Sequence, residues 1–193
     1  MRIPTIEECY ELMNSQAMLP NIVAHSKQVA RVAAAIMDHL KDGTDIRRPA
    51  VITACLLHDI TKTRSLQTRE QHDVSGGHLL AQLGFPTIGA MVEEHVVLKD
   101  FQEEGELLEK ELVYYADKRV MHDRIVTVAE RVDDLIVRYG TTEERIRSIT
   151  SNFEQLCRLE AKISRFVTSD IQNILDQIDS GSRPDNRLQN LTN

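Results

Sequence analysis

Residues 54–62 read ACLLHDITK, an apolar run that ends in an imidazole and a carboxylate side by side. The run predicts that a buried helix delivers the pair His58-Asp59. A buried carboxylate beside a buried imidazole is unfavourable unless the groups are paired, hydrogen-bonded or bound to a metal. Because two side chains cannot fill the coordination shell of a divalent ion, a metal here would need ligands from other parts of the chain.

Candidates for these further ligands are His25 upstream of the pair and His72, His95 and Asp117 downstream. Each lies at a core-facing or terminal position of a different predicted helix, which is how a helical bundle assembles a metal site. Taken singly, each has an ordinary alternative: His25 as a core histidine, Asp117 as an ion-pair partner of Arg119. Nitrogen and carboxylate donors without thiolate favour iron, manganese, zinc, nickel or cobalt over a cysteine-bound zinc.

The composition is typical of a helical protein. Among 193 residues the hydrophobic fraction is 41%, the aromatic fraction is 4%, and there is no Trp. Such an aliphatic core suits helix-on-helix packing better than a sheet sandwich. No stretch approaches the roughly 20 apolar residues of a membrane span, and the N-terminus lacks the apolar segment of a signal peptide. With three scattered cysteines, we expect a cytoplasmic protein with reduced thiols.

The formal net charge of −7 argues against general nucleic-acid binding, for which a basic surface is expected. It does not exclude a small anionic substrate, because the local charge at a site can oppose the global sign.

Helical periodicity runs through nearly the whole chain, and convincing strands are absent. Residues 61–71 are polar and basic without a periodic apolar face, which predicts a loop. We predict one all-α domain over residues 1–179, with a metal-site core at about 20–120, C-terminal helices at about 122–178, and a disordered tail at 180–193. The predicted helices span 5–18, 20–40, 51–60, 74–83, 86–98, a segment around 112–117, 123–138 and 141–178.

These motifs resemble the H…HD…D signature of the HD-domain metal-dependent phosphohydrolases. The string ACLLHDITK is similar to the family's ALLHDIGK, and HDVSGGHLL at 72–80 is similar to the HPEIGAELL of HDIG-type members. VEEH at 92–95 and YADK at 115–118 match the next two positions, so the resemblance covers about residues 22–118. Thr61 occupies the position at which glycine is common in the family string. This difference does not affect a ligand position.

The resemblance is closest to the six-ligand subset of the family. The HHE and GYP strings of cyclic-di-GMP phosphodiesterases do not occur at the corresponding positions, and the pattern is nearer to bacterial hydrolases of dinucleoside polyphosphates. It implies a helical bundle of the HD type that binds one or two divalent ions. The implied ligands are His25, His58, Asp59 and Asp117 for a first ion, and His72 and His95, with Asp59 as a bridge, for a second.

The same resemblance implies which residues act on a substrate. Asp59 and Lys62 are the implied catalytic residues, and Lys62 is expected to meet the phosphate. For every basic residue in this set, a solvated surface position is the alternative. The candidate substrate-binding residues are Lys62, Arg64, Arg69, Lys118 and Arg119.

The sequence therefore predicts a metal-dependent phosphohydrolase in which a metal-bound hydroxide attacks a phosphate ester or anhydride of a small, nucleotide-type substrate. The alternative is an HD-fold regulatory or nucleotide-binding module with little turnover. The long helix predicted at 141–178 either packs across the bundle or forms a homodimer surface. Substrate, metal identity and the number of ions stay open at this stage.

Overall fold

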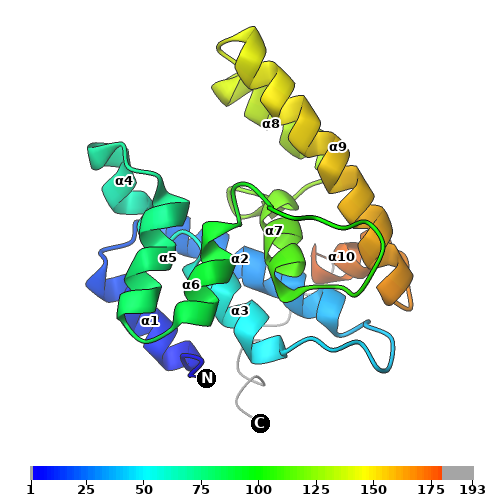
Figure 1. Ribbon diagram of the computed structural model, residues 1–193, viewed down its shortest axis with the longest axis horizontal. Coiled ribbons are helices and arrows are strands. Elements are labelled where there is room, and N and C mark those ends of the chain that lie inside the picture. The colour runs from blue at the N-terminus through cyan, green and yellow to red at the C-terminus, as the bar shows by residue number, and fades with distance from the viewer. Residues whose placement is uncertain (1, 180–193) are drawn as a thin grey trace.

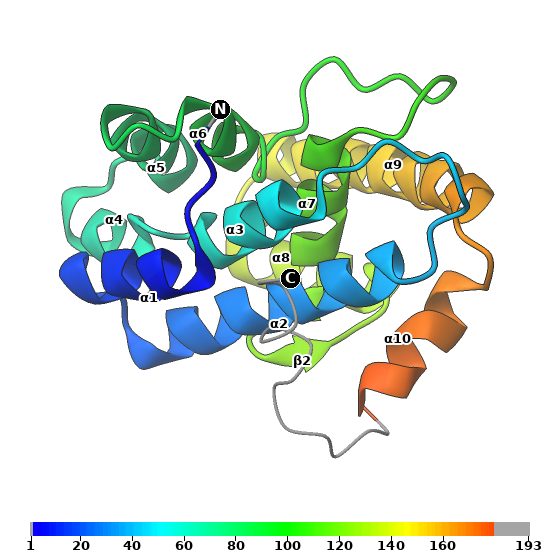
Figure 2. The same ribbon diagram turned by 90° about the horizontal axis from the view of Figure 1, so that it is seen from below.

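The apolar run before His58 forms the central helix of the structure, a computed structural model that describes residues 2–179. This helix, α3 (Arg48–Leu57), begins with a proline in its first turn, where the missing N–H has no helical partner to lose. Every residue from Ala50 to Leu57 is buried. Around α3 pack α1 (Ile6–Ser15), α2 (Pro20–Met37), α6 (Pro86–Glu93) and α7 (Glu109–Lys118), as Figure 2 shows.

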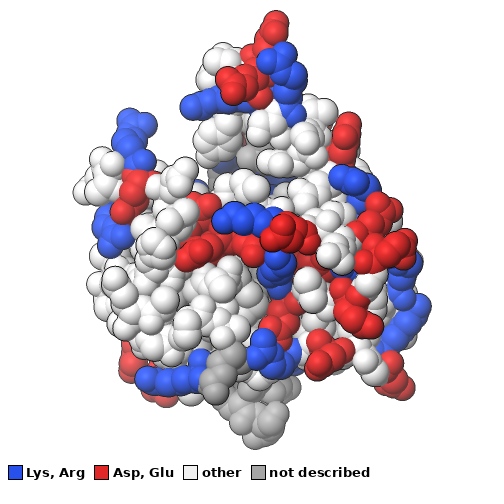
Figure 3. Space-filling model, in the orientation of Figure 1, with Lys and Arg blue, Asp and Glu red and all other residues white. Residues whose placement is uncertain are grey.

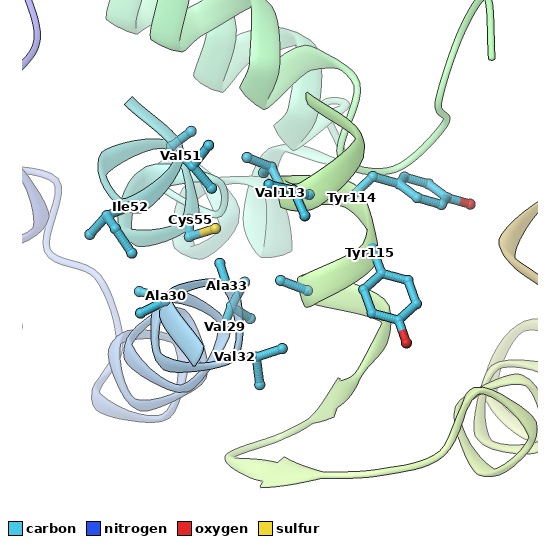
Figure 4. Packing of buried hydrophobic residues seen from close by; sticks show 14 of the residues in the cluster. Val29, Ala30, Val32, Ala33, Val51, Ile52, Cys55, Val113, Tyr114 and Tyr115 are labelled. Atoms are coloured by element: carbon cyan, nitrogen blue, oxygen red, sulfur yellow. The ribbon is translucent and has the colours of Figure 1, made fainter. Parts of the chain in front are cut away.

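The hydrophobic core lies where α2, α3 and α7 meet. Figure 4 shows Val29 and Ala33 of α2 close to Cys55 of α3, with Val113 of α7 completing the contact. All four side chains are fully buried. Small and β-branched residues let these helices approach one another closely, so the low aromatic content is no obstacle to dense packing.

The other elements form two groups on either side of this core (Figure 1). A short helix and a longer one follow α3, and a helical hairpin projects from the body of the molecule. The all-α prediction is confirmed, apart from one small antiparallel strand pair. In chain order these elements are α4 (Lys62–Thr68), α5 (His72–Gln82), β1 (Val120–Met121), β2 (Arg124–Ile125), α8 (Val128–Tyr139), α9 (Glu143–Phe166) and α10 (Ile171–Asp179).

The prediction of a loop at residues 61–71 was wrong, because α4 occupies most of this segment. The loop was predicted because the segment has no apolar stripe. However, α4 has no buried residue, so this helix needs no apolar stripe. Arg69 ends the helix in the left-handed conformation, with φ of 63°. A short exposed helix of this kind leaves little periodic signal in the sequence.

Several predicted helix boundaries also differ from the structure, among them those of three later helices. The helix predicted at 86–98 ends at Glu93, and the one predicted at 123–138 begins at Val128, where Thr127 and Glu130 form a capping box. The helix predicted at 141–178 is divided into α9 and α10, because the chain around Val167 pairs with the segment that follows α2.

The described residues contain no helix that is both long and apolar enough to cross a membrane. The predicted disordered tail, residues 180–193, lies outside the described residues.

Two glycines allow α5 and α6 to cross with their backbones in contact. A Cβ added to Gly89 would lie 2.4 Å from the carbonyl oxygen of Gly77, and a Cβ added to Gly77 would lie 2.7 Å from the carbonyl oxygen of Gly89. Both helices carry predicted metal ligands at or beside their ends, so this crossing also sets the distance between those ligands.

We expect Gly89→Ala to destabilise the protein by about 1–3 kcal/mol, because the clash is with a backbone atom that no rotamer change can move. The better helix propensity of alanine, about 1 kcal/mol, acts in the opposite direction and is too small to cancel the clash. Urea unfolding followed by circular dichroism measures the difference. The exposed Gln82→Ala variant serves as control, and a Gly89→Ala protein as stable as wild type would contradict the close crossing.

Candidate metal centre

Six polar side chains from separate segments meet at the C-terminal end of α3. Four of them are imidazoles arranged in an edge-to-face series, with ring centroids 5.2 Å apart for His25–His58, 4.9 Å for His58–His95 and 5.1 Å for His72–His95. The two others are the carboxylates of Asp59 and Asp117. They are contributed by α2 (His25), the turn after α3 (His58 and Asp59), α5 (His72), the segment after α6 (His95) and α7 (Asp117).

Two of these histidines are oriented by the helix ends that they follow. His58 donates from Nδ1 to the carbonyl oxygen of Cys55 at 2.7 Å, and His95 donates from Nδ1 to that of Val92 at 2.6 Å. Both acceptors are carbonyls in the last turn of a helix, which the regular helical ladder leaves without a donor four residues on; that of Val92 also accepts from the backbone N–H of His95 at 3.3 Å. The same contacts therefore terminate α3 and α6 and fix each ring. The partial negative charge of the helix C-termini also favours a cation nearby.

His25 is oriented by a different kind of backbone group. Its Nδ1 donates to the carbonyl oxygen of His122 at 2.7 Å. His122 lies in the turn between β1 and β2 with φ of 59°, a left-handed conformation that is uncommon outside glycine. With Nδ1 protonated in the two rings above, Nε2 of His58 and of His95 can turn its lone pair toward the cluster, the form in which imidazole binds a metal. Nε2 of His25 instead faces Oδ1 of Asp117 at 3.0 Å.

Asp59 turns its two oxygens toward different histidines. Its Oδ2 is 3.6 Å from Nε2 of His58, and its Oδ1 is 3.2 Å from Nε2 of His72 and 3.6 Å from Nε2 of His95. Asp117 lies on the opposite side of the cluster. Its Oδ1 is 3.0 Å from Nε2 of His25 and 3.6 Å from Nε2 of His58.

The protonation of the cluster suits metal binding. Burial lowers the pKa of His58 to about 4, so its imidazole is neutral at pH 7. Burial by itself would raise the pKa of Asp59 and of Asp117, but the neighbouring histidines and lysines outweigh it and hold both well below their usual range. Burial also lowers the pKa of His25, yet the hydrogen bond and charge of Asp117 leave it raised overall. The raised pKa means that a proton is held between Nε2 of His25 and Asp117, and a cation bound between these two residues would take its place.

The donor atoms of the cluster are placed so that they could bind a divalent ion. His58 Nε2 and Asp59 Oδ1 are buried and have no hydrogen-bond partner within residues 2–179, a costly state unless an ion satisfies them. Donor atoms of His25, His58 and Asp117 lie within 4.8 Å of one another, as do those of His58, Asp59 and His95. Donors placed about 2.0–2.2 Å from a common ion have spacings compatible with this.

Nε2 of His72 has a polar neighbour inside the cluster and another outside it. It lies 3.2 Å from Nε2 of His95 and 3.1 Å from Nζ of Lys62. The thiol of Cys55, three positions before His58, is not among the donor atoms of the cluster: it is fully buried, and burial raises its pKa.

A cavity of about 470 Å³ opens beside the cluster. His25, Asp59, His72, His95 and Asp117 line one end of it, and side chains of α8 and α9 line the opposite wall. Figure 3 shows the molecule hollowed between the α4 side and the α8–α9 hairpin. The candidate ligands are thus within reach of a small molecule.

The structure brings two of the predicted basic residues to the cavity, Lys62 and Lys118. Lys118 donates from Nζ to Oδ2 of Asp117 at 2.6 Å and to the carbonyl oxygen of His95 at 2.8 Å. Arg64 and Arg69 lie on the exposed α4, outside the cavity lining, and Arg64 pairs with Glu70.

Arg119 was expected to bind substrate, but it does not line the cavity. Its guanidinium is buried and donates to the carbonyl oxygen of Val126 at 2.8 Å and to Oε1 of Gln172 at 2.7 Å. Its carboxylate partner is Glu160, at 3.2 Å, rather than Asp117, so Arg119 connects the end of α7 to the residue after β2, to α9 and to α10. Two adjacent basic residues, Lys118 and Arg119, point in different directions because successive side chains on a helix are about 100° apart.

The sequence prediction missed the wall opposite the metal ligands. Val132 and Leu135 of α8 line the cavity together with Arg131, and Asn152 and Phe153 of α9 do so from the neighbouring helix. The capping box at Thr127 was the available signal that a separate amphipathic helix begins there.

Comparison with known proteins identifies the family. A family model described as HD domain matches residues 22–133, more than half of the chain. The chain belongs to the HD-domain family, within the superfamily of metal-dependent phosphohydrolases, as the motifs predicted. No curated protein and no solved structure gives a significant match.

We expect the chain to bind a divalent transition metal and to gain about 2.7 kcal/mol of stability when the free metal is at 100 times its dissociation constant. His58→Ala should abolish most of this gain, because His58 borders both donor groups. Thermal unfolding with and without manganese, combined with metal analysis by mass spectrometry, tests it. His78→Ala is the matched control, since this side chain is 69% exposed and lies outside the cluster. Full metal content in His58→Ala would contradict the assignment.

The arrangement around Asp59 also predicts a metal count. Wild type should bind two ions, and His95→Ala should bind one, because His95 faces only Oδ1 of Asp59. Equilibrium dialysis against manganese gives both numbers. A single ion in wild type would restrict the site to the donors around His25, His58 and Asp117.

Proposed function

We propose that this chain is a metal-dependent phosphohydrolase that cleaves a phosphate ester or anhydride of a nucleotide-type substrate. Membership of the HD-domain family supports the reaction class. The observation that carries the proposal is the buried carboxylate of Asp59, with imidazole nitrogens facing each of its oxygens at the end of an accessible cavity. A divalent ion held there lowers the pKa of water and polarises a phosphoryl group.

In this proposal the ligands divide between the two oxygens of Asp59. Oδ2 faces His58, which together with His25 and Asp117 would hold one ion. Oδ1 faces His72 and His95, which would hold the other. Asp59 would bridge the two because a carboxylate can offer one oxygen to each of two cations.

Lys62 is the residue best placed to meet the phosphate. Its Nζ lies 3.9 Å from Oδ1 of Asp59, yet its side chain is 31% exposed and lines the cavity. It therefore touches both the ligand cluster and the space a substrate would enter. Lys118 has its ammonium committed to Asp117 and to a backbone carbonyl, so its main effect is to offset the buried carboxylate. Between them the two lysines offset the negative charges of Asp59 and Asp117, which line the same cavity.

The second candidate is an HD-fold regulatory or nucleotide-binding module with little turnover. The intact set of donor groups favours the enzyme, because a module that only binds has no need of polarising metals. A homodimer through the C-terminal helix stays a prediction. Against it, the second half of α9 packs into the body: Lys162 is buried and donates to Oε1 of Glu111 at 2.8 Å.

The experiment that separates the two candidates is a hydrolysis screen. Metal-free protein is restored with manganese, iron, cobalt, nickel or zinc and assayed against nucleotides and dinucleoside polyphosphates. Turnover of a member of this panel is the expected result. The absence of turnover with every metal would favour the binding module.

We expect Lys62→Ala to lower kcat by about 10²-fold while leaving the metal content unchanged, since one charged donor to the developing phosphate charge is lost. Steady-state kinetics and metal analysis on the same preparation measure both quantities. Lys99→Ala removes a lysine from an exposed position outside the cavity and is the control. If Lys62→Ala loses its metal, or keeps full activity, the phosphate-binding role of Lys62 is wrong.

A further inference from the structure

We infer that the cavity wall formed by α8 and α9 is a subsite for the base of a nucleotide, in which Phe153 offers an apolar face and Arg131 donates hydrogen bonds to the edge of the ring. The inference rests on the proposed function for the position of the phosphate. Its own residues lie on the wall opposite the metal ligands and after the last HD motif, at residues 115–118, although Arg131 and Val132 are still within the range that the family model matches.

The cavity has two chemically different ends. The end at the metal ligands carries Lys62 and Lys118, whereas the opposite wall presents Val132 and Leu135 from α8 and Phe153 from α9. A volume of about 470 Å³ falls within the range of roughly 300–1,000 Å³ typical of small-molecule sites. A phosphate at the charged end would therefore place the organic part of the same molecule against the apolar wall.

A polar group within that wall decides which organic part fits. The side chain of Arg131 is only 14% exposed. One nitrogen, NH1, donates to Oδ2 of Asp134 at 2.8 Å, but Nε is buried without a hydrogen-bond partner in residues 2–179. Asn152 adds an amide to the same wall. An alkyl chain packed here would leave these groups unsatisfied, which is unfavourable.

A nucleobase satisfies both requirements of the wall. Its faces are apolar and stack on aromatic side chains, and its edge carries carbonyl and ring-nitrogen acceptors. Phe153 is partly buried against the core and lines the cavity. Tyr114, also in the lining, already has Nζ of Lys118 4.8 Å from its ring centroid. Tyr139, a third aromatic side chain in the lining, is 48% exposed. Phe153 is therefore the best placed of the three rings to receive a base.

A chain of contacts fixes Arg131 relative to the metal ligands. Asp134 accepts from Arg131 through Oδ2 and from Nε of Arg138 through Oδ1, the latter at 2.7 Å. Arg138 in turn lies 3.0 Å from Nε2 of His122, whose carbonyl orients His25. The base-binding wall and the metal end are thus connected through the β1–β2 turn, so their separation is set by the fold, as positioning of a substrate requires.

Binding without turnover tests the subsite. The full chain, freed of metal by chelation and checked for native helicity by circular dichroism, is titrated calorimetrically with AMP, GMP, CMP and UMP. Ribose 5-phosphate, which lacks a base, is the reference. We expect at least one nucleotide to bind about tenfold more tightly than ribose 5-phosphate.

Matched variants assign this preference to the wall. Phe153→Ala and Arg131→Gln should each weaken that nucleotide by about tenfold and leave the affinity for ribose 5-phosphate unchanged. Val137→Ala, at a position 86% exposed on α8, and Arg147→Gln, at an exposed position on α9, are the controls and should bind like wild type.

The outcomes separate this inference from the proposed function. Nucleotides that bind no better than ribose 5-phosphate, or variants that weaken both equally, would overturn the subsite. Hydrolysis of base-free phosphate esters as fast as of nucleotides would also overturn it and leave the phosphohydrolase standing. If binding is base-selective but the chain hydrolyses nothing after metal is restored, the subsite is supported and the proposed phosphohydrolase function is overturned.

Discussion

Two carboxylates buried in an aliphatic helical core are the constraint on which the rest of this structure depends. Asp59 and Asp117 lie almost out of contact with solvent, where a negative charge is stable only beside compensating positive charge or hydrogen-bond donors. Lys118 is bonded to Asp117, and Lys62 is close to Asp59, but Nε2 of His58 and Oδ1 of Asp59 have no hydrogen-bond partner among residues 2–179. A divalent ion bound here would supply the missing charge and would thereby link the site to the stability of the fold around it.

The same contacts that end the helices also prepare the ligands. His58 and His95 each follow a helix end and bond back to a carbonyl three residues earlier, at Cys55 and Val92. This explains why α6 stops before His95 although apolar periodicity continues beyond it. If α6 continued past Glu93, the ring of His95 would lie on the side of the helix and would not be bonded to the carbonyl of Val92. At the Nδ1 side of both rings, orientation therefore comes from a backbone carbonyl at the helix end, while Nε2 faces the other members of the cluster.

The cavity extends the site from metal chemistry to recognition. In the proposed function, the candidate ligands and the lysines at one end would hold a phosphate, while α8 and α9 contribute an apolar wall that includes Arg131. The β1–β2 turn connects the two ends, because the carbonyl of His122 orients His25 and its imidazole contacts Arg138. A hairpin of four paired residues would thus set the distance between the proposed phosphate and base positions.

The sequence by itself determined the fold class, the family and the identity of the candidate ligands, because helical periodicity, capping residues and the HD motif are local signals. It could not determine where those side chains point. His25 and Asp117 are 92 positions apart and meet only through the packing of α2 against α7. Packing alone turned Arg119 into the interior, placed α4 as an exposed helix without an apolar stripe, and brought Arg131 to the cavity wall. Each of these depends on which elements are neighbours in space, and local sequence carries no record of that.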